Sequence, residues 1–149
     1  MARGRPPVGG RSREAATSDV KPALLTVDNV PRLGFGCSGA DAQCQTMVQV
    51  VVSLLDHGMG VQAAIEAPRV TITSVPSSIF QHAWRPGGLA MESRILRRVQ
   101  DQLTARGHRI EVVQAFAPYM AGVSAVRRRD NGVFEAGADP RREGSALGR

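Results

Sequence analysis

Residues 36–45 read GCSGADAQCQ and join a glycine-rich bend to the start of a predicted helix. We expect the bend to span Gly34 to Ala40, and Asp41 to cap a helix that runs to about His57. The backbone N–H groups of Gly39 and Ala40 would then point outward at the helix N-terminus, where the helix dipole favours negative charge. One interpretation is therefore an anion-binding bend, suited to a phosphate or to the oxyanion of an acyl-transfer reaction.

A dinucleotide site is one alternative, because the residues from Gly34 to Gly39 match the GxGxxG pattern. A dinucleotide-binding fold also needs a second parallel strand that ends in an acidic residue about twenty positions further on. Asp56 lies near that distance, but it closes the predicted helix, and a second helix is expected at Val61–Ala67. We therefore favour a tight strand-to-helix turn that requires small residues.

Cys37 offers another alternative, because a thiol beside a helix N-terminus could have a lowered pKa and act as a nucleophile. No histidine lies near Cys37 in the sequence to act as its base, and a small residue in a tight turn is the simpler interpretation. The histidines His57, His82 and His108 lack the spacing of metal ligands, so we expect no metal site.

Short strands and helices alternate along the rest of the chain and predict a mixed α and β fold. Ala23–Val27 and Leu33–Phe35 flank turn-forming residues, which predicts a β-hairpin. The helix after the bend carries apolar residues on more than one face, including Val48 and Val52, which predicts burial between two layers. Further along we expect a helix at Ile95–Ala105, strands at Arg69–Thr73, Leu89–Glu92, Ile110–Val113, Val123–Arg127 and Val133–Glu135, a loop at Val75–Pro86, and a polar, loop-like tail at Ala136–Arg149.

The composition limits the classes of protein to which this chain can belong. Of its 149 residues, 42% are hydrophobic, which excludes a wholly disordered chain. The 19 basic residues are 18 arginines and Lys21, and they exceed the acidic residues to give a net charge of +6. A basic nucleic-acid-binding module is therefore an alternative. However, no aromatic residues interleave with the arginine runs 127–129 and 141–142 to stack on bases, so we consider a nucleic-acid partner the weaker hypothesis.

Residues 1–20 differ from the rest, since they are rich in Arg, Gly, Pro and Ser, and we expect an irregular basic arm there. This arm lacks the apolar core of a secretory signal, and no stretch of the chain is long and apolar enough to span a membrane. We therefore expect no membrane partner, and the sequence favours a cytoplasmic over a secreted location.

Motifs in residues 21–149 resemble, in the same order, those of the gamma-glutamyltransferase family. Residues 36–45 resemble its G-[ST]-P-G-G-D-A-Q-x-Q stretch, and residues 56–69 (DHGMGVQAAIEAPR) resemble its D-x-G-M…A-x-x-A-P-R. Residues 106–108 (RGH) resemble its R-G-H, and residues 137–148 (GADPRREGSALG) resemble its terminal G-x-x-D-P-R-x-x-G-x-A-x-G-Y. Together these ordered motifs resemble the C-terminal part of the family's small subunit, in its broader bacterial branch.

The resemblance implies an N-terminal-nucleophile hydrolase, so the expected fold class is α+β, with this chain forming part of an αββα sandwich. In that family a precursor cleaves itself into a large and a small subunit, and the new N-terminal Thr of the small subunit attacks a gamma-glutamyl amide. The α-amino group of that Thr acts as the base, since its pKa lies near neutrality. The acyl group then passes to water, an amino acid or a peptide, and no cofactor is implied.

The resemblance also implies roles for particular residues of this sequence. Gly39 and Ala40 match the pair whose backbone N–H groups hold the oxyanion. Ser18 aligns near the position that binds the substrate carboxylate. Arg69 and Arg141 match arginines that support the active-site region and maturation.

The D-P-R motif separates two neighbouring arginines of the tail. Pro140 biases Asp139 away from a helical conformation, so residues 139–142 are expected to form an extended or turn segment. We expect Arg141 to point inward, towards carboxylates of the larger subunit, and Arg142 to point to solvent.

This sequence departs from the family pattern at several positions. Cys37 and Ser38 replace the usual Ser or Thr and Pro, and Ala40 replaces the second Gly, where a Cβ restricts φ. Arg149 stands where the family ends in Tyr. Most important, no run like the family's nucleophile motif T-T-H-x-[ST] precedes the bend, so we expect the nucleophile to lie outside this chain.

We therefore expect this chain to supply the oxyanion hole and scaffold for acyl transfer or hydrolysis of gamma-glutamyl or related amides, and to be inactive by itself. The expected partner is an upstream segment or large subunit of the same enzyme. We call this chain, joined to the coding sequence directly upstream of it, the completed protein. The alternatives are a non-catalytic remnant and a subunit that completes another polypeptide. The acyl donor and the acceptor stay open.

Overall fold

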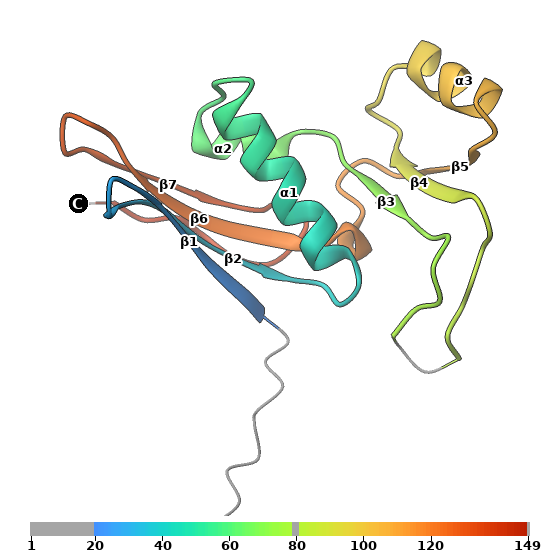
Figure 1. Ribbon diagram of the computed structural model, residues 1–149, viewed down its shortest axis with the longest axis horizontal. Helices are drawn as coiled ribbons and strands as arrows, with labels where there is room; N and C mark the ends of the chain where they lie inside the picture. The colour runs from blue at the N-terminus through green and yellow to red at the C-terminus, as the bar shows by residue number, and fades with distance from the viewer. Residues whose placement is uncertain (1–19, 79–80, 149) are drawn as a thin grey trace, which may run out of the picture.

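The computed structural model describes residues 20–78 and 81–148, which contain two β-sheets (Figure 1). The larger sheet has four antiparallel strands in the order β1-β2-β6-β7. The expected hairpin is confirmed, and its turn is at Asp28 and Asn29, which both have the positive φ of a tight two-residue turn. The strands span Val20–Val27 (β1), Val30–Ser38 (β2), Gly122–Arg128 (β6) and Phe134–Ala138 (β7).

The smaller sheet has three strands in the order β3-β4-β5. β3 and β4 are antiparallel, whereas β4 and β5 are parallel and are joined through helix α3. Every residue of the central strand β4 is buried. The elements span Val70–Ile72 (β3), Gly88–Glu92 (β4), Arg97–Ala105 (α3) and Arg109–Val113 (β5), and a 3₁₀ turn at Pro118–Met120 leads into β6.

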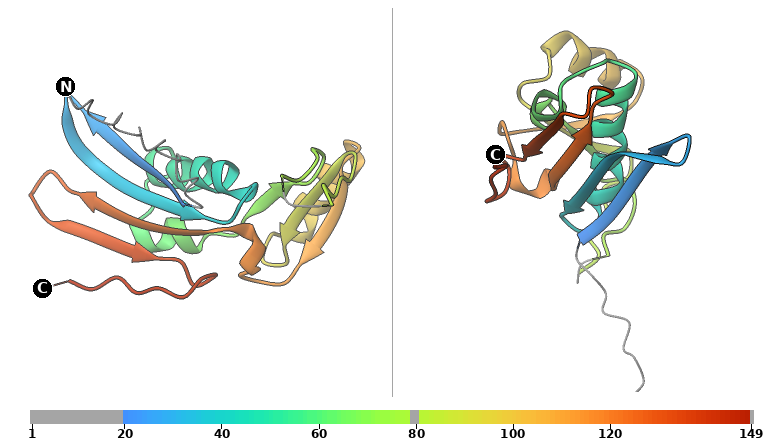
Figure 2. Two further views of the ribbon diagram at one scale, coloured as in Figure 1. Left: turned by 90° about the horizontal axis from the view of Figure 1, so that it is seen from below. Right: turned by 90° about the vertical axis from the view of Figure 1, so that its left-hand side faces the viewer.

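The helices α1 (Ala42–Leu55) and α2 (Val61–Glu66) lie on one face of the larger sheet (Figure 1 and Figure 2). Side chains alternate along a strand, so every second residue of β2 and β6 points towards these helices. The expected α+β class is therefore confirmed, with one helix layer against one sheet layer. The core between the layers includes Leu33, Cys37, Val50, Leu54, Ile65, Val123 and Ala125.

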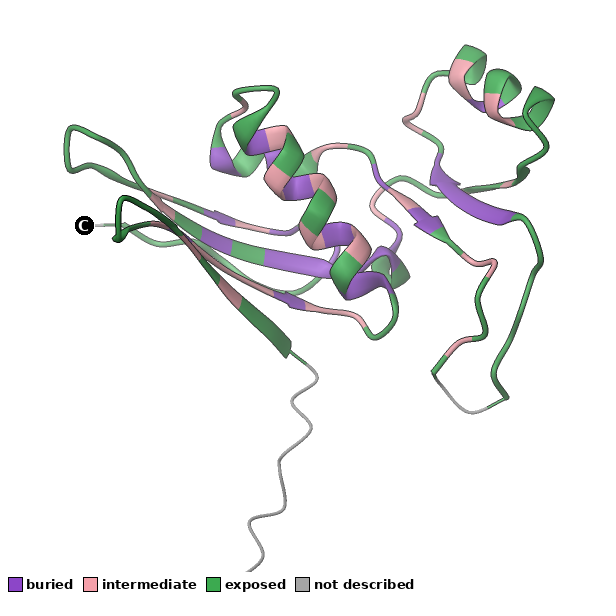
Figure 3. Cartoon of the chain, viewed as in Figure 1, coloured by how far each residue is buried: buried purple, intermediate pink, exposed green. Residues whose placement is uncertain are grey.

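The opposite face of the larger sheet exposes large apolar side chains. Much of β1, at the edge of this sheet, is coloured as exposed in Figure 3. Leu24, Val126 and Phe134 are 64%, 47% and 66% exposed. Gly34 pairs with both Leu24 and Val126 and leaves the middle of this face flat. In a two-sheet sandwich, such a face packs against the inner face of a second sheet.

The outer side of α1 is apolar as well. Val48 and Val52 are 63% and 37% exposed, whereas the sheet-facing Val50 and Leu54 are buried. We predicted that this helix is buried between two layers. Within the described residues only the side that faces the larger sheet is covered, and the outer side is exposed.

Several predicted boundaries are wrong. α1 ends at Leu55 instead of His57, and α3 begins at Arg97 instead of Ile95. The glycine-rich bend is shorter than predicted, because residues 34–38 continue β2. Since β2 has an antiparallel neighbour on each side, no βαβ unit forms around it, and the dinucleotide interpretation is wrong.

The predicted loop-like tail is wrong for residues 136–138, which complete β7. The predicted arm, residues 1–20, lies outside the described residues except for Val20, which begins β1. Within the described residues, no helix combines the length and the apolar character needed to cross a membrane.

We expect the isolated chain to aggregate or to stay poorly folded, because its open sheet face and strand edges are uncovered. Replacing Leu24 and Phe134 by Ser should raise the fraction of soluble monomer, measured by size-exclusion chromatography with light scattering. The matched change Leu33→Ser should lower it, since Leu33 is buried in the core. A wild-type chain that is monomeric, unfolds cooperatively and shows well-dispersed amide resonances would contradict this expectation.

Candidate functional site

The bend between β2 and α1 consists of Gly39 and Ala40, which have φ values of 135° and 47°. The N–H groups of Ala42 and Gln43 close it by donating to the carbonyl oxygens of Gly39 and Ala40, each at 3.2 Å. The N–H groups of Gly39 and Ala40 themselves donate to no other described residue. The bend therefore leaves two amides available beside the first turn of α1.

The backbone of the bend approaches Ala121 closely, and this explains why glycine is required at position 39. A Cβ on Gly39 would lie 2.5 Å from both the Cα and the Cβ of Ala121, which is closer than such atoms can approach. Ala40 carries a Cβ in the left-handed region, which costs an L-residue roughly 1–2 kcal/mol. The φ of Ala121 is also positive, at 63°, so unfavourable backbone conformations concentrate here.

Asp41 stands at the N-cap position of α1, but the predicted side-chain cap is wrong. Its carboxylate accepts hydrogen bonds from the Ser77 hydroxyl at 2.8 Å, the Ser78 N–H at 2.9 Å and the Ser78 hydroxyl. These bonds, first of all that from the Ser78 hydroxyl, hold the pKa of Asp41 below its ordinary value. The ionised side chain therefore ties the loop between β3 and β4 to the start of α1.

A pocket of about 740 Å³ opens beside the bend. Gly39 and Ala40 line it together with the start of α1, β3 and the loop that follows β3. Ile72 and Tyr119 contribute apolar surface, and Arg142 reaches the pocket from the C-terminal tail. The residues that carry the two available amides thus border a space large enough for a small-molecule substrate.

The nucleophile interpretation of Cys37 is wrong. Its side chain is 0% exposed and belongs to the core beneath α1. Burial raises the pKa of its thiol to about 11, the opposite of the predicted lowering. Cys37 is a small core residue of β2.

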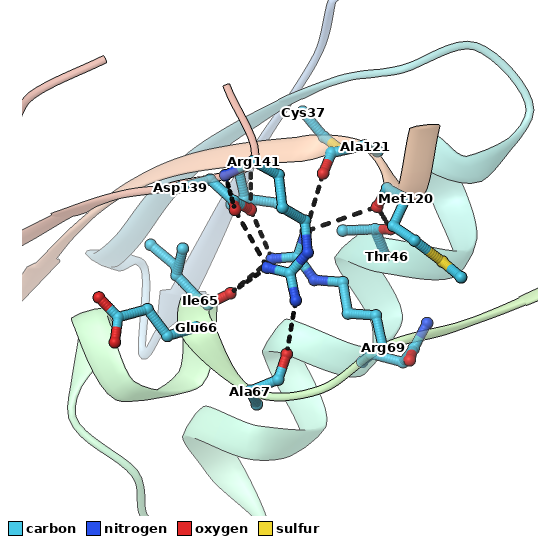
Figure 4. A network of polar contacts seen from close by, with 12 residues as sticks. Cys37, Thr46, Ile65, Glu66, Ala67, Arg69, Met120, Ala121, Asp139 and Arg141 are labelled. Atoms are coloured by element: carbon cyan, nitrogen blue, oxygen red, sulfur yellow. Dashed lines mark hydrogen bonds and ion pairs between the residues drawn. The ribbon is translucent and has the colours of Figure 1, made fainter. Parts of the chain in front are cut away.

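Arg69 lies in a buried polar network next to the bend and is 1% exposed (Figure 4). Its Nη1 donates to the carbonyl oxygen of Ala121 at 2.9 Å, and its Nη2 donates to that of Ile65 at 2.7 Å. The same Nη2 lies 2.6 Å from a carboxylate oxygen of Asp139. Arg69 therefore fixes Ala121, the residue against which Gly39 packs.

Arg141 is the second arginine of this network and is also buried (Figure 4). Its Nε and Nη2 donate to the two carboxylate oxygens of Glu92, at 2.7 and 2.8 Å. The remaining donors bind Asp139 at 3.0 Å and the carbonyl oxygens of Ile65 and Ala67 at 3.0 and 2.9 Å. All five side-chain N–H groups of Arg141 are therefore paired.

Glu92 ends β4, and its side chain is 0% exposed. Burial by itself would raise the pKa of Glu92, but the hydrogen bonds from Arg141 and Arg94 outweigh it and hold the pKa below its ordinary value. The backbone N–H of Arg69 also donates to this carboxylate, at 3.3 Å. The inward orientation predicted for Arg141 is confirmed, but its partners are carboxylates of this chain and not of a larger subunit.

The network brings together motifs that lie far apart in the sequence. It joins Arg69 of the A-P-R motif and Arg141 of the D-P-R motif, and it reaches the bend through Ala121. The R-G-H motif lies apart, at the end of α3, and Ser18 lies outside the described residues. Glu92 was not among the predicted site residues. The signal for it is an acidic residue that ends the apolar run 88–91, because such a residue is seldom buried.

Comparison with known proteins identifies the family. The family model described as gamma-glutamyltranspeptidase matches residues 11–149. This chain belongs to the gamma-glutamyltranspeptidase family. It is 30% identical over 138 residues to the glutathione hydrolase-like YwrD proenzyme of Bacillus subtilis, covering 91% of this chain and 25% of that protein. It is 27% identical to the oxamate amidohydrolase proenzyme of Klebsiella pneumoniae, covering 87% of this chain and 23% of that protein.

A solved structure shares the fold of this chain. The gamma-glutamyltranspeptidase from Pseudomonas nitroreducens, in complex with L-DON, matches with a TM-score of 0.71 at 21% identity, over 95% of this chain and 66% of that one. The expected fold, part of an N-terminal-nucleophile hydrolase sandwich, is thereby confirmed. The chain spans about a quarter of the length of the two curated relatives.

In the completed gamma-glutamyltranspeptidase-family protein, Arg141→Ala should lower stability far more than Arg142→Ala. Removing Arg141 takes away the buried cation that pairs with the carboxylates of Glu92 and Asp139, and breaking a buried ion pair costs roughly 3–5 kcal/mol. Arg142 is exposed, and truncating an exposed residue usually costs less than about 0.5 kcal/mol. The thermal unfolding midpoint of the two variants measures the difference. Equal effects, or a larger effect at Arg142, would show that the C-terminal motif has been placed out of register.

Proposed function

We propose that this chain forms the oxyanion hole and part of the scaffold of an enzyme that hydrolyses or transfers the acyl group of gamma-glutamyl or related amides. The observation that carries the proposal is the pair of available amides at Gly39 and Ala40, two residues that line the 740 Å³ pocket at the start of α1. Preorganised backbone amides at a helix N-terminus stabilise negative charge where it develops. Relatives named as a hydrolase and an amidohydrolase support amide chemistry.

The nucleophile in this proposal is the N-terminal Thr of a segment upstream of this chain. Its oxygen attacks the amide carbon, a C–O bond forms, and the proton passes to the α-amino group of the same Thr. The carbonyl oxygen becomes an oxyanion and accepts hydrogen bonds from the N–H groups of Gly39 and Ala40. The C–N bond then breaks, and the amine leaves with the proton from the ammonium group. Water or a second amine takes the acyl group by the same steps.

The proposed partner is the upstream segment or large subunit of the same enzyme. It would cover the apolar face that Leu24, Val126 and Phe134 expose, which is uncovered in the described residues. Nucleic acid is a poorer fit, because Arg141 is buried and Arg129 pairs with Glu135, so the arginine runs form no continuous free basic surface. A non-catalytic completing subunit is the second candidate, favoured by the left-handed φ of Ala40, where the family pattern has Gly.

The completed protein should release p-nitroaniline from gamma-glutamyl p-nitroanilide, whereas the isolated chain should not. Within the completed protein, Gly39→Ala should lower kcat by about 100-fold or more, since its Cβ would collide with Ala121 and displace the amide. Ala40→Gly, on the same bend, should keep or raise kcat because it relieves the left-handed strain.

Self-cleavage and the thermal unfolding midpoint of each variant separate a loss of fold from a loss of catalysis. A self-cleaved, stable Gly39→Ala enzyme with wild-type kcat would show that these amides do not hold the oxyanion. Turnover by the isolated chain that Cys37→Ala abolishes would place the nucleophile in this chain and overturn the proposal.

A further inference from the structure

Arg142 is the one cation lining the pocket that has no acidic partner among the described residues. Arg85 also lines the pocket, but it forms an ion pair with Glu111. The carboxylate of Asp41 is occupied by Ser77 and Ser78. No carboxylate of residues 20–78 or 81–148 lies within ion-pair distance of Arg142. An exposed guanidinium in a pocket without a counter-ion can receive an anionic ligand.

The buried network fixes the backbone that carries Arg142. The N–H of Arg142 donates to the carbonyl oxygen of Asp139 at 3.1 Å and closes a turn through Pro140 and Arg141. The Asp139 carboxylate is itself held by Arg69 and Arg141 and by the N–H of Val123. Because Arg141 points into this network, its neighbour is presented on the other side of the turn.

The stem of Arg142 lies across the larger sheet next to the bend. A Cβ at Gly122 would lie 2.2 Å from the Cγ of Arg142, so the absence of a side chain on Gly122 makes room for this stem. Gly122 pairs with Ser38 between β6 and β2, and Ser38 directly precedes Gly39. The side chain is therefore anchored one strand away from the bend, and it lines the same pocket as the two amides.

We infer that Arg142 binds a carboxylate of the amide substrate while the amides of Gly39 and Ala40 hold the reacting carbonyl group. This inference rests on the proposed function and makes Arg142 a specificity-determining residue for acidic amides. Arg142 occupies an x position of the D-P-R-x-x-G pattern, where the pattern specifies no residue. We therefore assign Arg142 to the choice of substrate and not to the chemistry that the family shares. The carboxylate can belong to the acyl group or to the leaving amine.

Two matched pairs of chromogenic amides test the inference in the completed protein and identify the side of the substrate. Glutaryl and butyryl p-nitroanilide differ only in a carboxylate on the acyl group. Gamma-glutamyl p-nitroanilide and its 3-carboxy derivative differ only in a carboxylate on the leaving group. Arg142→Gln should lower kcat/KM by about 10- to 100-fold for the more acidic member of one pair relative to the other member.

Two further variants separate recognition from structural effects. Arg142→Lys should recover part of the loss, because it keeps the charge but not the planar fork. Arg106→Gln, an exposed arginine after α3, should change neither pair. An equal loss within both pairs, butyryl p-nitroanilide included, would overturn the inference, and so would unchanged discrimination in Arg142→Gln.

Failure of the proposed function gives a different result, since the wild-type completed protein would then hydrolyse none of the four amides. In that case, calorimetry with glutarate decides about Arg142. Binding to the wild type that is lost in Arg142→Gln would support the carboxylate site without the enzyme activity. Equal binding to both proteins, or binding to neither, would overturn the carboxylate site as well.

Discussion

The buried ion pair between Arg141 and Glu92 holds together parts of the chain that are far apart in the sequence. Both side chains are 0% exposed, so neither charge has water to replace its partner. Asp139 extends the pair to Arg69 and to the N–H of Val123 in β6. The tail, β4 and the larger sheet therefore share one set of hydrogen bonds, and Asp139 and Arg141 of the polar tail are buried because they complete that set.

The same network governs the site. Arg69 donates to the carbonyl oxygen of Ala121, and Ala121 is the surface against which the backbone of Gly39 packs. The turn that buries Arg141 also sends Arg142 over Gly122 and into the pocket. The bend and the side chain of Arg142 are the two groups proposed to contact a substrate. The positions of both thus depend on buried residues that do not contact the substrate. This dependence explains why charged residues are buried so close to the pocket.

The parts of the fold that could be predicted from the sequence are those with a local signal. The hairpin turn at Asp28 and Asn29 and the helix after the bend depend on neighbouring residues and are largely as predicted. The partner of Arg141 could not be predicted, because Glu92 lies 49 positions away and periodicity carries no information on such pairs. Cys37 shows the same limit. Its position just before a helix suggested a reactive thiol, but its side chain points from β2 into the core, and the local sequence does not reveal that contact.

Hydrogen exchange of the completed protein carrying Arg141→Met, read by mass spectrometry, tests most directly whether the network ties these parts together. The variant replaces Arg141 by an unbranched apolar side chain. It removes the guanidinium group that pairs with the carboxylates of Glu92 and Asp139. If the network is the common support, peptides from β4, from β6 and from the bend at Gly39 and Ala40 should all lose protection together. Faster exchange confined to the tail, with β4 and β6 as protected as in the wild type, would contradict this account.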